Sequence, residues 1–209
     1  MFAKTFEKFN YSSLLISSLL ILGITFYYSS LEIKWSFVES KILNGSLIFG
    51  ALMLTNYSID TVTRQLTIER SSRKAYHLLL YPLVIMCYPM ESVDLKFILS
   101  STGVWAAWRN MRIFIEQTNN TKRIKRLFDA IILLSFSSLI ILDNLIIFFY
   151  PLLVLITTNI KKDLKYFIII FITPLIILPS AYALLSFLSL DSYLFSSYFF
   201  ADQTQAIDE

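Results

Sequence analysis

Long apolar segments separated by short polar connectors account for most of this chain. A helix needs about 20 apolar residues, and roughly 17–25 in practice, to cross the hydrocarbon core of a bilayer. Several of the segments are at or below that lower limit, which indicates short helices. The pattern therefore predicts an all-α polytopic bundle, a single integral membrane domain over 1–209, with seven spans at 11–30, 42–59, 75–90, 95–108, 127–142, 145–160 and 166–190.

The apolar stretch 127–160 is predicted to hold two of these helices. At about 1.5 Å per residue it is too long for one span. Asp143 and Asn144 interrupt it near the middle, and both residue types favour turns. We expect two short helices in a tight hairpin.

The first apolar segment, 11–30, follows Lys4 and Lys8, a layout that a signal peptide shares. A cleavable signal needs small residues at positions −3 and −1 of the cut. Cuts after Ser29 or Ser30 would place Tyr27 or Tyr28 at −3, and both are too bulky. We interpret the segment as an uncleaved first span.

Positive charge is distributed unevenly along this path. If the N-terminus is inside, 15 of the 18 Lys and Arg residues fall in inner segments, and Lys34, Lys41 and Lys96 fall outside. Short cytoplasmic loops carry an excess of Lys and Arg. The N-terminus is therefore predicted to be cytoplasmic and the acidic, aromatic tail 191–209 periplasmic. That tail is expected either to lie along the outer interface or to dock a partner.

Composition excludes several classes of protein. Hydrophobic residues make up 56% of the chain and charged residues 16%, whereas soluble domains average about 25% charged. This argues against a soluble enzyme, a disordered chain and a nucleic-acid binder. The single cysteine, Cys87, excludes an internal disulfide framework. With one histidine, His77, a histidine-based metal site is not expected, and we expect no cofactor.

Asp129 is the one acidic residue that this threading places within a span, and His77 lies near the inner end of the third span. An intramembrane carboxylate is a functional candidate by default. Asp129, however, follows Lys125 and Arg126 at the predicted helix start, where it could reach the interface and the positive helix N-terminus. His77 could relay protons, or it could be an interfacial residue beside a basic connector. Both alternatives stay open for both residues.

Three carboxylates, Glu32, Glu39 and Asp143, are weak catalytic candidates on the predicted outer face. The seven-residue spacing of Glu32 and Glu39 would put them on one side of a helix, two turns apart. Asp143 could bind a cation or a sugar hydroxyl, although turn formation alone explains it.

The fourth segment is rich in small and hydroxyl residues. Small residues let transmembrane helices approach closely, and hydroxyls can form hydrogen bonds between helices. We expect this segment to be buried among the other helices, with its packing positions at Ser100, Ser101, Gly103 and Ala107.

The region from Arg64 to Leu190 resembles a family of uncharacterised polytopic inner-membrane proteins of Bacteroidota. The likeness lies in Lys-Arg-Leu-Phe-Asp-Ala at 125–130, the Asp-Asn hairpin, Lys-Lys-Asp-Leu-Lys at 161–165 and Ile-Thr-Pro-Leu at 172–175. That family is distantly similar to membrane glycosyltransferases of the GT-C type, which use polyprenyl-phosphate sugars and often carry an acidic residue in the first outer loop. The resemblance implies an outward-facing site for a polyprenyl-phosphate lipid, with Glu32 and Glu39 in that loop.

These observations lead to three hypotheses for a protein of the bacterial inner membrane. The first is a non-catalytic accessory or scaffold subunit of a cell-envelope complex, whose partners are the lipid bilayer and other membrane-protein subunits. The second is a small GT-C-like glycosyltransferase, or its subunit, acting at the periplasmic face. The third is a transporter subunit, which would need polar residues at mid-bilayer depth.

Overall fold

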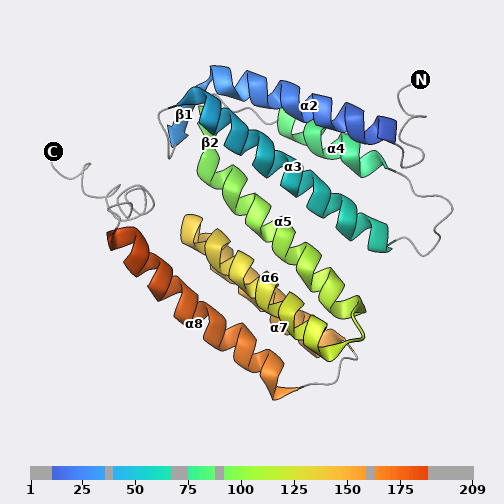
Figure 1. Ribbon diagram of the computed structural model, residues 1–209, viewed down its shortest axis with the longest axis vertical. Coiled ribbons are helices and arrows are strands. Elements are labelled where there is room, and N and C mark those ends of the chain that lie inside the picture. The colour runs from blue at the N-terminus through green and yellow to red at the C-terminus, as the bar shows by residue number, and fades with distance from the viewer. Residues whose placement is uncertain (1–10, 36–39, 67–74, 88–91, 159–162, 188–209) are drawn as a thin grey trace, which may run out of the picture.

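The described residues form a bundle of seven α-helices with one 3-10 segment and one small pair of strands (Figure 1). The computed structural model describes residues 11–35, 40–66, 75–87, 92–158 and 163–187. The helices are α2 (Tyr11–Ser30), α3 (Lys41–Leu66), α4 (Tyr76–Met86), α5 (Leu95–Glu116), α6 (Asn120–Ile140), α7 (Phe149–Thr157) and α8 (Leu164–Phe187). The 3-10 segment is η2 (Leu142–Phe148), and the strands are β1 (Glu32–Trp35) and β2 (Ser92–Asp94).

Successive helices run in opposite directions. Figure 1 shows α2, α3, α5, α6 and α8 side by side, with α4 and α7 behind them. The ends of α3, α5 and α7 and the starts of α4, α6 and α8 lie toward the right of that view, and these are the ends that adjoin the basic connectors. The chain therefore reverses direction at each connector. This agrees with the assumption, used in counting the charges, that successive spans cross the membrane in opposite directions.

Three of the helices are long and apolar enough to cross a membrane, within Tyr11–Ser30, Lys41–Thr63 and Leu164–Leu184. Two shorter apolar helical stretches, Tyr76–Met86 and Leu142–Thr157, occur among the described residues. A membrane protein built from helices is therefore supported. The seven-span path remains a prediction.

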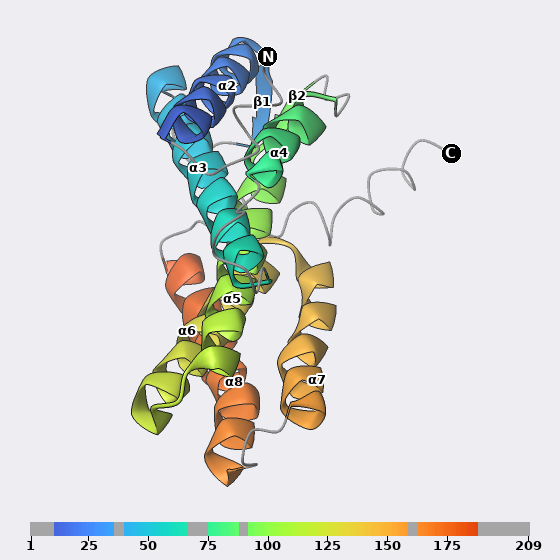
Figure 2. The ribbon, with the colours of Figure 1, turned by 90° about the vertical axis from the view of Figure 1, so that its right-hand side faces the viewer.

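The described bundle has two large hydrophobic cores, to both of which α5 belongs, and a small third cluster around Ala75 and Leu78. The first core joins α2 and α3 to the start of α5, through Leu95 and Ile98. The second joins the later turns of α5 to α6, α7 and α8, through Ala107, Met111 and Phe114. Figure 2 shows α5 passing between the two groups of helices.

The polar connector expected at 109–126 is largely helical, which corrects the sequence-based boundaries at 108 and 127. α5 continues to Glu116, and α6 begins at Asn120. Asn119 is the N-cap of α6: its side chain accepts hydrogen bonds from the backbone N–H groups of Thr121 and Lys122, at 3.0 and 3.3 Å. Arg and Lys are good helix formers, so the charged residues extend both helices beyond their apolar parts.

The hairpin expected near Asp143 and Asn144 begins slightly earlier. α6 ends at Ile140, and Ile141 has an extended backbone with φ −132° and ψ 110°. Asp143 and Asn144 then lie in η2 rather than in an open turn. A single span over 127–160 is therefore wrong, while the break lies about two residues before the position expected.

The β1–β2 pair was not expected in an all-α chain. The strands are parallel, with Glu32 opposite Ser92 and Ile33 opposite Val93. They connect the segment after α2 to the segment before α5, two places that the threading put on the same side of the membrane. The sequence suggested that Glu32 and Glu39 share one side of a helix. This is wrong for Glu32, which lies in a strand.

Candidate functional site

A buried acidic residue, Asp60, pairs with the only histidine of the chain where α3 meets α4. The Nε2 atom of His77 lies 2.9 Å from Oδ1 of Asp60, and the side chains are 18% and 3% exposed. A charged carboxylate in so little water needs hydrogen bonds and an opposite charge to offset its lost hydration. His77 supplies a ring N–H, and a positive charge when it is protonated.

A second polar contact lies one turn earlier on α3 and joins three helices. Nδ2 of Asn56 donates to Oγ of Ser17 on α2, at 2.8 Å, and that hydroxyl donates to the carbonyl oxygen of Leu78 on α4, also at 2.8 Å. Ser17 and Asn56 are almost fully buried. Because Asn56 and Asp60 are four residues apart, they share one face of α3. Asn56 and Asp60, together with Ser17 and His77, form what we call the inner polar cluster.

Sequence reasoning missed Asp60, because it treated this residue as the first of a connector that begins where the apolar run ends. In the structure α3 continues to Leu66, and Asp60 lies inside the stretch Lys41–Thr63 that could cross a membrane. Two signals were available: the Asn56–Asp60 spacing on a helix, and a lone histidine just beyond the connector. Neither reveals the pairing, which depends on how α4 packs against α3.

The inner polar cluster also changes the interpretation of His77. The sequence suggested an interfacial side chain close to Arg73 and Lys74. In the structure His77 also makes a specific contact to a buried carboxylate. Two groups that can exchange a proton lie within hydrogen-bonding distance, which is the minimum geometry for proton transfer. The same contact holds α3 and α4 together.

A third polar contact lies between α5, α6 and η2. Ser100 and Ser137 exchange hydrogen bonds: each hydroxyl donates to the other residue's carbonyl oxygen, at 3.1 and 2.9 Å. Nδ2 of Asn144 donates to both hydroxyl oxygens. The amide has two N–H groups and each hydroxyl has one, so these bonds use every donor of the three side chains. These three residues are called the serine–asparagine contact below.

The four packing positions expected on the fourth segment are all on α5. Ser100 and Ala107 are about 1% exposed. A Cβ atom at Gly103 would lie only 3.1 Å from Cβ of Ser137 and 3.3 Å from the carbonyl oxygen of Leu133. Ser101 is partly buried, and its hydroxyl donates to the carbonyl of Ile98 in its own helix. Ser100, Gly103 and Ala107 therefore contribute to helix contacts, and Ser101 bonds within α5.

Asp143 and Asn144 are neighbours with opposite environments, and this difference predicts different effects on stability. Asp143 is exposed, whereas Asn144 is half-buried and donates to Ser100 and Ser137. We expect Asn144→Ala to lower the free energy of unfolding in detergent by about 1–2 kcal/mol, because two buried hydroxyls lose a donor. Asp143→Ala is the matched control and should change it by less than about 0.5 kcal/mol. Equal effects of the two changes would contradict the contact.

Asp129 lies deeper in its helix than the sequence suggested. α6 begins at Asn120, so Asp129 is in the third turn, beyond the reach of the helix N-terminus that was expected to stabilise it. Its Oδ2 atom lies 4.0 Å from Nη1 of Arg126, and both side chains are more than one-third exposed. An exposed pair at this separation contributes little to stability. The interfacial interpretation of Asp129 fits this geometry better than a buried acidic site.

The outer carboxylates do not form a described site. Asp143 is exposed on η2, the backbone of Glu32 lies in β1, and Glu39 lies outside the described residues, as does the tail 191–209. Among the described residues there is no group of three His, Cys, Asp or Glu side chains that could hold a metal ion.

Comparison of the chain with models of known protein families, with curated proteins and with solved structures finds no match. The contacts within the bundle are therefore the basis for any statement about function.

Proposed function

We propose that this chain is a non-catalytic accessory subunit of a membrane complex, embedded in the bacterial inner membrane. The observation that carries the proposal is that the buried polar side chains of two groups form hydrogen bonds with one another. In the inner polar cluster and in the serine–asparagine contact, they bind one another between helices. Polar groups used in this way specify how helices pack in lipid. The inner membrane, the envelope complex and the seven spans are parts of this proposal.

A binding face for a partner helix is available on the second half of α8. Its first half is anchored, because Tyr166 packs edge-on against Phe114 and its hydroxyl donates to Oδ1 of Asn120, at 2.6 Å. Thr173 is the last residue of α8 whose side chain is described as buried. Beyond it Leu175, Ile176, Tyr182, Leu184 and Phe187 are exposed, from 49% for Tyr182 to 89% for Phe187, while Ile177 and Leu178 are partly buried. Only 11% of the apolar, membrane-length part of α8 is buried within the described bundle.

An apolar groove continues this face between η2, α7 and α8. It has a volume of about 380 Å³, and its lining residues are Leu145, Phe148, Phe149, Leu152, Ile170, Phe171, Pro174 and Leu175. Membrane helices associate through close van der Waals packing. A groove beside an exposed helix provides the uneven surface on which a second helix can pack.

Purification of the full chain in a mild detergent tests the proposal. We expect another membrane protein to co-purify in a fixed ratio with the wild type, and to be lost from the double variant Leu175→Ala, Ile176→Ala. The control is Leu15→Ala, Leu19→Ala, which removes similar apolar area from an exposed face of α2 and should keep the partner. The assignment would be overturned if the chain purified as a monomer without a partner and worked in that form, or if the chain alone catalysed a reaction.

Proton or cation transport is a second candidate, favoured by the Asp60–His77 pair. The acidic residue lies in a helix long enough to cross a membrane and is almost fully buried. Ionisable residues in such positions commonly belong to proton relays or ion pathways. The change Asp60→Asn separates the two candidates, because it keeps a hydrogen-bonding side chain and removes the titratable group. Transport requires that group, whereas helix packing does not.

A further inference from the structure

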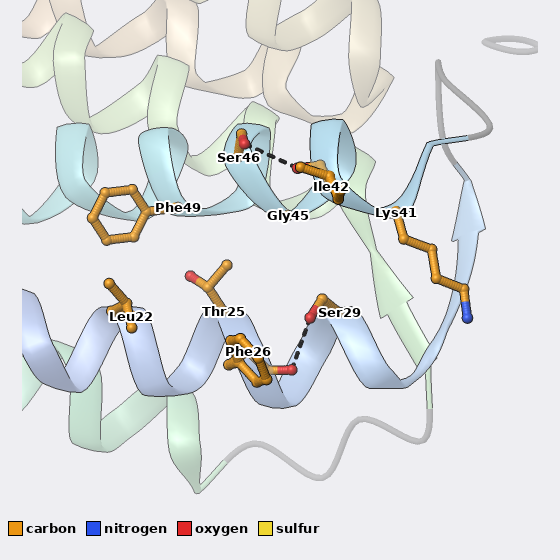
Figure 3. A pocket seen from close by; sticks show the side chains of 9 residues that line it. All are labelled: Leu22, Thr25, Phe26, Ser29, Lys41, Ile42, Gly45, Ser46 and Phe49. Carbon is orange, nitrogen blue, oxygen red and sulfur yellow. Dashed lines mark hydrogen bonds between the residues drawn. The ribbon is translucent and has the colours of Figure 1, made fainter.

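A groove between α2 and α3 opens at the end of the bundle where β1 and β2 lie. Its volume is about 500 Å³. Figure 3 shows the residues that line it, with Leu22 and Phe49 at one end and Lys41 at the other. From Leu22 to Ser29 the groove follows two turns of α2, about 10 Å along the helix axis. It lies between two of the helices that could cross a membrane.

The walls of this groove are apolar, and its hydroxyl groups are already engaged. Phe26 and Ile42 are exposed, at 78% and 82%. The hydroxyls of Thr25, Ser29 and Ser46 each donate to a carbonyl of their own helix, at 2.8 to 2.9 Å. The groove therefore suits a hydrocarbon chain. At Gly45 the two helices are close, since a Cβ atom there would be in van der Waals contact with Cβ of Ser29, at 3.8 Å.

One positive charge stands at the end of the groove. Lys41 is the first residue of α3 and is exposed. No described carboxylate forms an ion pair with it. Its side chain extends away from the apolar end of the groove (Figure 3). The positive end of the α3 dipole points the same way and adds to the attraction for an anion. Apolar walls with a cation at the mouth match a molecule that has a hydrocarbon chain and an anionic head.

We propose that this groove binds a membrane lipid with a net negative phosphate headgroup. The phosphate lies at Lys41, in the leaflet that contains the β1–β2 end of the bundle, and one acyl chain lies between Leu22, Phe26 and Phe49. The surrounding bilayer supplies the ligand, and the exposed walls give it lateral access. The inference rests on the membrane location proposed above and does not depend on the partner of α8.

Native mass spectrometry of the full-length protein in detergent, with equal amounts of phosphatidylglycerol and phosphatidylcholine, tests the site. We expect the wild type to retain phosphatidylglycerol preferentially. Lys41→Gln should weaken phosphatidylglycerol binding roughly fivefold, the factor expected for one lysine facing an anionic lipid, and leave phosphatidylcholine unchanged. Lys41→Arg should keep the preference.

A second pair of variants tests the apolar part of the groove. Gly45→Leu places a side chain in it and should weaken the binding of both lipids. The control is Gly23→Leu, which adds the same side chain to an exposed position of α2 outside the groove and should bind like the wild type. Circular dichroism confirms that each variant is folded.

Three results would overturn the site: lipid retention unaffected by Gly45→Leu, a phosphatidylglycerol preference unaffected by Lys41→Gln, or displacement of the lipid by millimolar inorganic phosphate. The last result would mean that free phosphate, rather than a lipid, is the ligand. Extraction of the protein from membranes by alkaline carbonate would instead refute the membrane location itself. Failure of the lipid site and failure of the proposed function are therefore distinguishable.

Discussion

His77→Ala is expected to lower the free energy of unfolding by about 2–3 kcal/mol, the largest effect we expect from a single polar substitution in this protein. The change removes a hydrogen-bond donor from Asp60, whose side chain is 3% exposed. A buried carboxylate that loses such a partner retains much of its desolvation cost. The measurement is the midpoint of unfolding as a denaturing detergent is added to mild-detergent micelles.

A double-mutant cycle isolates the pair. His77→Ala and Asp60→Ala together should destabilise the protein by about 1–2 kcal/mol less than the sum of the single changes, because the contact between the two side chains is lost only once. Thr61→Ala is the control, since Thr61 adjoins Asp60 on α3 but its hydroxyl donates to Tyr57 in the same helix. Additive effects in the cycle would contradict a direct interaction. If Asp60→Asn keeps this stability but abolishes proton-dependent transport, the transport candidate replaces the accessory one.

Gly103→Val is expected to lower the free energy of unfolding by about 1–3 kcal/mol, because the added side chain forces α5 away from α6. The close approach of Cβ at position 103 to backbone as well as to side-chain atoms of α6 leaves little room for adjustment. Separation of these helices would also strain the hydrogen bonds between Ser100 and Ser137, one turn away. Detergent unfolding and the helical circular dichroism signal measure the loss.

The other glycines of the bundle provide matched controls. A Cβ atom at Gly23 or Gly50 would meet no other atom within 4 Å. Because alanine is the better helix former by about 1 kcal/mol, Gly23→Ala and Gly50→Ala should leave stability unchanged or raise it, whereas Gly103→Ala should show no such gain. A similar gain at all three positions would show that α5 and α6 are not closely packed at Gly103.

Local apolarity was a good guide to where helices lie. The expected helix 11–30 has the bounds of α2, and the expected start at 166 lies two residues after the start of α8. The chain also breaks between α6 and η2, close to where the turn-forming residues Asp143 and Asn144 indicated. These features depend on short-range properties, namely apolar run length and turn preference, which the amino-acid sequence expresses directly.

Apolarity was a poor guide where a helix continues into charged residues. The ends of α3 and α5 and the start of α6 contain Arg, Lys and Glu, which lower hydropathy but favour helix formation. For this reason Asp60 was assigned to a connector although it lies in α3, and Asp129 was placed too close to the start of α6. The pairing of Asp60 with His77 and of β1 with β2 depends on tertiary packing, and a single sequence carries no direct signal for it.

The position of α5 in both hydrophobic cores has a thermodynamic consequence. Ile98 packs with α2 and α3, while Met111 and Phe114 pack with α6 and α8, all from one continuous helix. A change in the tilt of α5 would therefore alter the packing free energy of both cores. If a lipid between α2 and α3 and a partner on α8 favour different tilts, each changes the affinity for the other by the same factor. In that case the lipid composition of the membrane would regulate assembly of the complex through a single helix.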